Sequence, residues 1–191
     1  TDCTNAYLPL LSTPTLWLSP SNDFHGLLDN MAWNWRNIPD NVLGISIAPH
    51  LNHRHTREHS VTMLLWFEQY LKGAFTMPKT PEVTLNLKAA DGIPAISVKP
   101  DTSLPVKGID VYYSVDPHVL TRNWRDGKAV KVGETWKANC PVMSLEQPLY
   151  IYANVIYDTP EKYRKMAFPL GAGNSPTFAI SSRPLLIGPS Q

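Results

Sequence analysis

Two short apolar runs dominate the pattern of the first quarter of the chain. Residues 14–18 and 42–48 are almost continuously apolar, and proline or polar residues close both runs. A run of this length with apolar residues at every position is typical of a strand buried on both faces, as in a parallel sheet. We therefore expect two strands of a parallel sheet here.

Helical spacing follows each of these runs. Residues 24–37 carry apolar side chains every three to four positions, which predicts a helix with one buried face that ends at Pro39. Residues 61–72 predict a second helix, capped by Ser60 and terminated by Gly73. Its apolar residues cover more than one face, so we expect it to be deeply buried.

The alternation of strand and helix predicts a crossover unit whose functional loops lie at the carboxyl ends of the strands. Two strands and two helices cannot cover both faces of a parallel sheet, and one strand edge is left without a partner. We therefore expect further strands of this sheet to come from elsewhere.

The pattern changes after the proline-rich residues 78–81. Short segments with alternating apolar and polar positions, rich in β-branched and aromatic residues, predict an immunoglobulin-like β-sandwich. These segments are residues 83–87, 95–98, 109–113, 130–132, 135–138 and 149–155. Arg122, Trp124 and Arg125 are expected to lie on one further strand with the charges outside.

Charge and composition exclude several classes of partner. The chain has 17 Lys and Arg against 16 Asp and Glu, a net charge of +1, without runs of like charge. We therefore expect no nucleic acid as partner. We also expect no membrane as partner, since no apolar stretch approaches the roughly 20 residues that span a bilayer. Cys3 and Cys140 are too few for a disulfide framework, and their pairing is left open.

The chemistry most readily suggested lies in the loops after the two expected strands. Asp23 follows the first strand and His53 follows the second. In serine hydrolases a carboxylate orients an imidazole that takes the proton of the nucleophile, and in one widespread fold the acid precedes the histidine in this way. We interpret Asp23 as the orienting acid and His53 as the general base.

These segments resemble the C-terminal half of secreted α/β-hydrolases, near the acetylxylan-esterase and PhoPQ-activated pathogenicity-related groups. The likeness rests on the turn at residues 21–26 and the loop at residues 49–53, and it covers residues 7–73. It implies a fold class of α/β followed by all-β, namely part of a parallel-sheet α/β-hydrolase and an immunoglobulin-like sandwich. It also implies a secreted or periplasmic location and a small-molecule or carbohydrate ester as substrate, without a cofactor.

The expected domains are therefore a hydrolase portion at 1–77, a linker at 78–81, a sandwich at 82–158 and an extended tail at 159–191.

The pattern Gly-x-Ser-x-Gly, which holds the nucleophile in this fold, occurs nowhere in the chain. We expect this chain alone to be inactive. Its expected partner is the N-terminal half of the hydrolase domain with the serine, in the same precursor or in a second chain.

Other interpretations stand beside this one. An aspartate after a strand often forms a turn or caps a helix, and His50, His55 and His59 compete with His53 as base, with His55 the runner-up. The chain also fits a binding or scaffold module whose hydrolase-like half has no nucleophile. In that case the source gene would carry no Gly-x-Ser-x-Gly segment upstream.

A zinc-dependent hydrolase is the third interpretation. His55, Glu58 and His59 match the pattern H-x-x-E-H, in which two histidines bind zinc and the glutamate acts as base. A third ligand is required, and the downstream candidate, Glu134, lies in an expected β-turn, whereas such peptidases place this ligand on a helix. We therefore rank zinc chemistry below the serine mechanism and expect no metal.

Overall fold

The computed structural model of the chain describes residues 4–89, 92–164, 166 and 174–188. Its helical segments are α1 (Thr4–Tyr7), the 3-10 helix η1 (Leu8–Leu10), α2 (Leu28–Trp35), α3 (Arg57–Tyr70) and α4 (Glu161–Arg164). Its strands are β1 (Thr15–Pro20), β2 (Leu43–Ala48), β3 (Glu82–Asn86), β4 (Ala95–Lys99), β5 (Val106–Ser114), β6 (Arg125–Asp126), β7 (Val130–Val132), β8 (Thr135–Asn139), β9 (Leu149–Asp158), β10 (Thr177–Ser181) and β11 (Leu185–Ile187).

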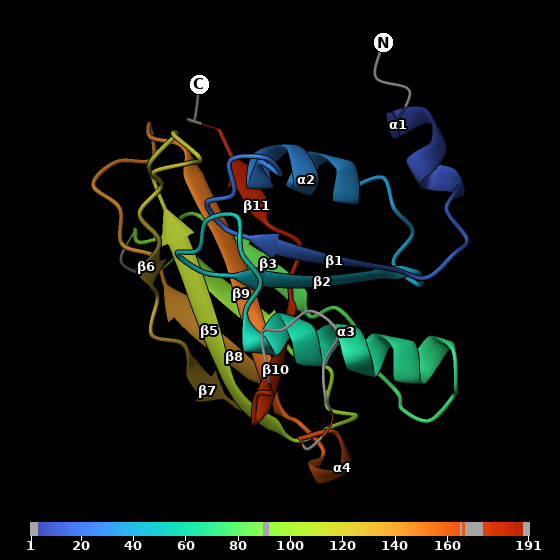
Figure 1. Cartoon of the computed structure of the whole chain (residues 1–191). Helices are drawn as coiled ribbons and strands as arrows, with labels where there is room; N and C mark the ends of the chain where they lie inside the picture. Colours follow the sequence, from blue (N-terminus) through green and yellow to red (C-terminus); the bar gives the residue numbers. More distant parts are fainter. Residues whose placement is uncertain (1–3, 90–91, 165, 167–173, 189–191) are drawn as a thin grey trace.

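The strands form three sheets (Figure 1). β1 and β2 are parallel, in a register that places Thr15 beside Leu43. The second sheet has the order β10-β9-β5-β6, and β11 also pairs with β9. The third sheet has the order β3-β4-β8-β7. All strand pairs of the second and third sheets are antiparallel.

The expected fold class, an α/β half with a parallel sheet followed by an immunoglobulin-like sandwich, is therefore wrong. Parallel pairing in the described part of the chain is limited to β1 and β2, and the protein is mostly antiparallel β-sheet. Residues 159–191, expected to form an extended tail, contribute β10 and β11 to the edge of β9 opposite β5. The proline and serine residues next to these strands obscured them, because each strand is only three to five residues long.

The long strand β9 separates two hydrophobic cores. Ile151, Ala153 and Val155 face the core between the two antiparallel sheets. The alternate residue Tyr152 faces a second core around α2 and β2. Successive side chains of a strand point to opposite faces, so the sheet of β9 is covered on both sides. The segments expected as separate hydrolase and sandwich units thus share their buried surfaces.

Helices α2 and α3 lie on opposite faces of the β1–β2 pair (Figure 1). Trp17 of β1 packs edge-to-face against Trp35 of α2, with ring centroids 6.1 Å apart. On the other face, the ring of Trp66 from α3 lies directly against the Cα of Gly44. A Cβ atom at Gly44 would clash with this ring, so glycine here permits the close approach of α3 to β2.

The start of α3 differs from the sequence prediction. The N-cap is Thr56, whose side-chain oxygen accepts a hydrogen bond from the backbone N–H of His59 at 3.1 Å, and Ser60 lies inside the helix. Gly73 adopts the expected left-handed conformation with φ of 62°. The helix is less buried than expected, because Phe67 and Leu71 at its end are 47% and 75% exposed.

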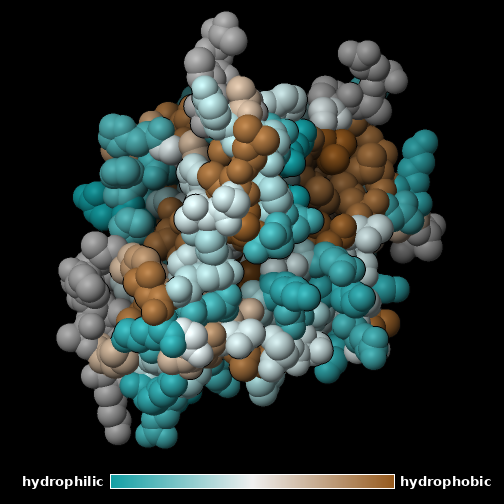
Figure 2. Space-filling model, turned by 90° about the vertical axis from the view of Figure 1, so that its right-hand side faces the viewer, coloured by the Kyte–Doolittle hydropathy of each residue, from teal (hydrophilic) through white to brown (hydrophobic). Residues whose placement is uncertain are grey.

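Apolar residues reach the surface on the side where β1 and β2 begin and α3 ends, which faces the viewer in Figure 2. Of the helices in the described part of the chain, none combines the length and apolar character that crossing a membrane requires. Cys140 is buried in the core between the antiparallel sheets, and Cys3 lies outside the described residues.

Candidate active site

Asp23 lies in the loop that follows β1, at the carboxyl end of the strand. Its Oδ1 accepts hydrogen bonds from the backbone N–H groups of His25 at 2.7 Å and Gly26 at 3.2 Å. These bonds form a tight turn that holds the carboxylate inward, and the residue is only 6% exposed. Asp23 is thus a turn former, and the same turn directs its carboxylate towards the neighbouring loop.

That neighbouring loop follows β2 and carries His53. The Nδ1 atom of His53 is 3.0 Å from both carboxylate oxygens of Asp23, although 30 residues separate the two in sequence. An ionised carboxylate only accepts hydrogen bonds, so this contact assigns the ring proton to Nδ1 and leaves Nε2 as the basic nitrogen. The side chain of His53 is 52% exposed, so the ring is accessible to a reacting group.

The environment of Asp23 keeps its carboxylate ionised. Burial alone raises the pKa of Asp23, but the N–H groups of His25 and Gly26 and the ring of His53 together outweigh burial. The pKa of Asp23 is therefore lowered below its ordinary value. An acid of this kind stabilises a positive charge on the His53 ring without taking up the proton itself.

Two aromatic rings lie next to the ring of His53. The rings of Phe24 and His25 lie 5.4 Å and 4.7 Å from the ring of His53, measured between centroids. Both come from the same turn that positions Asp23. The turn at residues 21–26 thus supplies both the carboxylate and the aromatic neighbours of the imidazole.

A network of polar side chains ties the two loops together behind this pair. Ser21 Oγ accepts a hydrogen bond from the backbone N–H of His50 at 2.8 Å and donates one to Asn22 Oδ1 at 2.7 Å. His50 has a positive φ of 55°, which lets the chain turn sharply after β2. Asn22 Nδ2 donates to carbonyl groups in residues 119–122, of which the Arg122 carbonyl at 2.8 Å is nearest.

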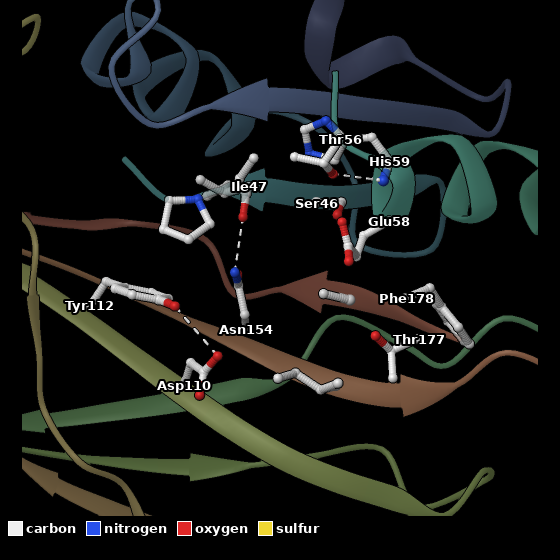
Figure 3. Close-up of a pocket in the computed structure, with 14 residues that line it drawn as sticks. Ser46, Ile47, Thr56, Glu58, His59, Asp110, Tyr112, Asn154, Thr177 and Phe178 are labelled. Carbon is white, nitrogen blue, oxygen red and sulfur yellow. Dashed lines mark hydrogen bonds between the residues drawn. The ribbon is translucent and has the colours of Figure 1, made fainter. Parts of the chain in front are cut away.

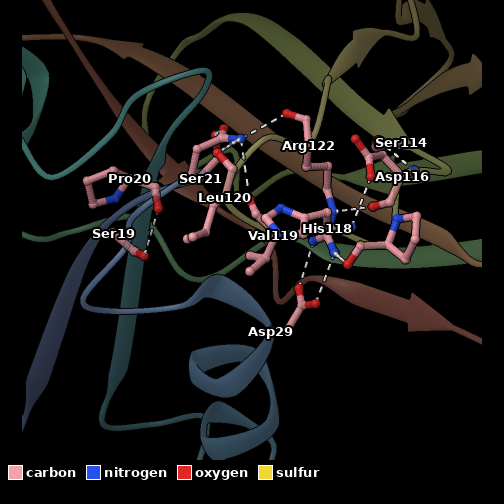
Figure 4. Close-up of polar contacts among 12 residues, drawn as sticks. Ser19, Pro20, Ser21, Asp29, Ser114, Asp116, His118, Val119, Leu120 and Arg122 are labelled. Atoms are coloured by element: carbon pink, nitrogen blue, oxygen red, sulfur yellow. Dashed lines mark hydrogen bonds and ion pairs between the residues drawn. The ribbon is translucent and has the colours of Figure 1, made fainter.

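The buried side chain of Arg122 anchors the loop at residues 119–122 (Figure 4). Its guanidinium group donates two hydrogen bonds to the carboxylate of Asp29 in α2, at 2.7 and 2.9 Å, and a third to the Asp116 carbonyl at 2.8 Å. The side chain is fully buried and lies over the ring of Tyr150, 3.5 Å from its centroid. The expectation that Arg122 points outwards is therefore wrong, whereas Arg125 in β6 is exposed.

The other histidines occupy different positions. His55, the runner-up for the base, is exposed and precedes the N-cap of α3, and the histidine bonded to Asp23 is His53. His59 lies in the first turn of α3 and is 1% exposed. The rings of His55 and His59 are 5.8 Å apart, but the helix begins between these residues, so they do not form the helical pair that the zinc pattern requires.

The expected third zinc ligand lies in a different part of the fold from His55, Glu58 and His59. Glu134 lies in the exposed turn between β7 and β8, in the third sheet. Within the described ranges, no group of three His, Cys, Asp or Glu side chains is placed to hold a metal ion. The residues of the zinc interpretation, His55, Glu58 and His59, thus lack a complete ligand set in this part of the chain.

Sequence reasoning predicted the contact between Asp23 and His53 but missed the residues that support it. Ser21 and Asn22 stand next to Asp23, and the preference of such residues for turns was the available signal. The ion pair of Arg122 with Asp29 had no local signal, because 93 residues separate its members.

Comparisons of the chain with models of protein families, with curated proteins and with solved structures found no match.

Proposed function

We propose that this chain supplies the acid and the base of a serine-dependent carboxylic ester hydrolase. The observation that carries the proposal is the contact of His53 Nδ1 with both oxygens of the buried Asp23 carboxylate, which leaves Nε2 on an accessible ring. The nucleophilic serine is supplied by a polypeptide segment outside the printed sequence, in the same precursor or in a second chain.

The chemistry follows from the protonation states of this pair. Nε2 of His53 takes the proton of the serine hydroxyl as its oxygen attacks the ester carbonyl, and the ring becomes an imidazolium. Asp23 stabilises this charge through Nδ1. The imidazolium then protonates the leaving alcohol, and His53 activates a water molecule in the same way to hydrolyse the acyl-serine ester.

The open edge of β1 supports the presence of a further segment. Among the described residues β1 has β2 as its one sheet neighbour. The N–H groups of Thr15 and Ser21 donate to carbonyls on the β2 side. Because alternate residues of a strand point their N–H groups to opposite edges, Leu16 and Leu18 present theirs on the other side. An edge of this kind accepts another strand.

The other edge of the pair is already satisfied. Ser181 Oγ accepts a hydrogen bond from the N–H of Ile47 in β2 at 2.7 Å, and Asn154 Nδ2 donates one to the Ile47 carbonyl at 2.9 Å. Side chains of β10 and β9 thus take the place of a neighbouring strand at β2. A strand that extends this small sheet would therefore pair with β1, the strand that leads to Asp23.

A binding or scaffold module is the second candidate. Two observations favour it. The turn at residues 21–26 is firmly anchored by Ser21, Asn22 and Arg122. In the described part of the chain, no hydroxyl or thiol group is bonded to His53. The two candidates differ in one property, because the complete protein reacts with a serine-directed reagent only if it is the enzyme. The first proposal includes the substrate, which is an ester of a small molecule or an acylated carbohydrate. It also includes export of the protein from the cell.

The test is labelling of the complete protein with a fluorophosphonate, which reacts only with an activated serine. We expect rapid labelling of the wild type, and a loss of about 10²- to 10⁴-fold in the rate for His53→Ala, because the general base is removed. His55→Ala is the matched control, since His55 is exposed and close in sequence, and it should label at the wild-type rate.

Two results would overturn the proposal. Absence of labelling in the complete wild-type protein would favour the scaffold module. Labelling that survives His53→Ala and is lost in His55→Ala would show that His55, and not His53, is the base.

A further inference from the structure

A cavity of about 350 Å³ lies between the start of α3, the end of β2 and the larger antiparallel sheet (Figure 3). Side chains of β5, β9 and β10 form its floor, and none of its described lining residues belongs to the Asp23–His53 pair. Ile156 and Ala179, which are paired across β9 and β10, give it an apolar surface. The size is that of a site for a small organic molecule.

Two carboxylates, those of Glu58 and Asp110, line this cavity, and Figure 3 shows them on opposite sides of the same space. Glu58 accepts a hydrogen bond from Ser175 Oγ at 3.1 Å, and Asp110 accepts one from the hydroxyl of Tyr112 at 3.4 Å. In the described part of the chain neither carboxylate forms an ion pair, and the described lining contains no lysine or arginine.

The charge on Asp110 is poorly compensated. Burial raises the pKa of Asp110, and the negative charge of Asp126 raises it further. Lys128, the cation that acts on Asp110 in the opposite sense, is already paired with Asp126 at 2.6 Å. Half-buried carboxylates are normally matched by a cation or by several donors, and this one has a single long hydrogen bond.

His59 provides an independent sign of an unfilled polar requirement. It contributes to the wall of the cavity and is 1% exposed, yet neither ring nitrogen makes a well-aligned hydrogen bond among the described residues, and the nearby backbone of Ser46 only partly offsets the effect of burial on the pKa of the ring. Burial, and secondly the charge of His55, lower the pKa of His59 to about 4, so the ring is neutral at physiological pH. Buried polar atoms of this kind are usually satisfied by a protein group, a water molecule or a ligand.

We propose that this cavity is a binding site for an organic ammonium compound. The ammonium group lies against the carboxylate of Asp110, with the charge of Glu58 across the cavity, and an apolar body packs on Ile156 and Ala179. A cation with hydrogen-bond donors satisfies Asp110 and is attracted by the charge of Glu58, whereas an anion would meet two negative charges and no lining cation. The site is independent of the ester hydrolase function, because it uses none of the residues of that mechanism.

A matched pair of probes tests this inference on the wild-type chain. 2-Phenylethylammonium carries the proposed cation on an aromatic body, and 2-phenylethanol has the same body without the charge. In a titration followed by ¹⁵N–¹H NMR, we expect the ammonium probe to shift the amides of residues 46–48 and 177–179 saturably, with a Kd in the millimolar range. The alcohol should bind roughly tenfold more weakly, because it lacks the charge-assisted hydrogen bonds.

Variants identify the carboxylates that bind the cation. Asp110→Asn together with Glu58→Gln should weaken the ammonium probe roughly tenfold and leave the alcohol unchanged. The control is Glu82→Gln, which removes a carboxylate that is 79% exposed on the third sheet and should change neither affinity. The inference is overturned if the ammonium probe does not saturate, if it shifts amides elsewhere, or if the two probes bind the wild type equally. The wild-type comparison decides this even if a variant does not fold.

Discussion

Two buried or half-buried carboxylates, Asp23 and Asp110, have opposite pKa shifts in this molecule. Burial raises the pKa of both, yet that of Asp23 is lowered overall and that of Asp110 is raised. The difference lies in their donors. Asp23 accepts from two backbone N–H groups and faces the His53 ring, whereas Asp110 accepts one long hydrogen bond from Tyr112 and lies near another carboxylate.

The comparison shows that burial alone does not tell what a carboxylate does. A carboxylate surrounded by donors in its own protein stays ionised and orients a neighbour, which is the property required of an orienting acid. A carboxylate with too few donors retains an unsatisfied charge, which is the property expected of a binding site for a cation. The predictions below test each side of this contrast.

The largest effect is expected from Asp23→Asn in the complete protein. The amide keeps the size of the side chain but offers a donor to Nδ1, which favours the wrong tautomer of His53. We expect the rate of fluorophosphonate labelling to fall by about 10⁴-fold. Asp158→Asn, an exposed aspartate at the end of β9, is the control and should label at the wild-type rate. A loss of less than tenfold in Asp23→Asn would remove Asp23 from the mechanism.

Removal of Arg122 should destabilise the loop to which Asn22 and the Asp23 turn are anchored. Arg122→Ala breaks a buried bidentate ion pair with Asp29 and leaves its carbonyl contacts unmade, so we expect a loss of about 3–5 kcal/mol in the free energy of unfolding. Denaturant unfolding measures this change. The control Arg125→Ala removes an exposed arginine from β6 and should cost about 0.5 kcal/mol or less. Equal costs for the two variants would contradict the assigned role of Arg122.

Acid should selectively weaken the Asp23 side of the comparison. The folded pKa of Asp23 lies below its unfolded value, so its contribution to stability is fully present above the unfolded pKa of about 3.9. That contribution is lost as the pH falls through the lowered folded pKa. The gap in unfolding free energy between the wild type and Asp23→Asn should therefore narrow below about pH 4. A gap that is constant between neutral and acid pH would show that the carboxylate charge is not stabilising.

The smallest effect concerns Asp110. Its folded pKa is raised, so the carboxyl group favours the folded state most at pH values below the unfolded pKa, and this advantage is lost as the pH rises through the folded pKa. Asp110→Asn removes the uncompensated charge and should raise the unfolding free energy at neutral pH by about 0.5 kcal/mol or less. A clear destabilisation at neutral pH would show that the charge of Asp110 is compensated in the free protein.

Local patterns predicted the elements around Asp23 and His53 well. β1, α2, β2 and α3 lie within a few residues of their expected ranges, because their apolar spacing reflects the face that each buries. The order of strand, acid, strand and histidine was sufficient to predict that Asp23 and His53 converge, since neighbouring parallel strands end at the same edge.

Local pattern also predicted the segments that form β3, β4, β5, β7, β8 and β9, but it did not predict how these strands pair. Whether a strand joins a parallel or an antiparallel sheet depends on pairings distant in sequence, such as β9 with β10 and β11. β9 is buried on both faces, which a single strand pattern does not distinguish from a parallel strand. Arg122 was placed outside because arginine is rarely buried, and only its partner Asp29 in another element makes burial favourable.

The central claim is that Asp23 holds His53 with its proton on Nδ1 and its Nε2 free to act as a base. The most direct test is the ¹⁵N NMR spectrum of the His53 ring under alkaline conditions, where imidazoles are neutral. We predict a protonated Nδ1 and an unprotonated Nε2 in the wild type, and loss of this preference in Asp23→Asn. A ring protonated on Nε2 in the wild type, or the same spectrum in both proteins, would contradict the account.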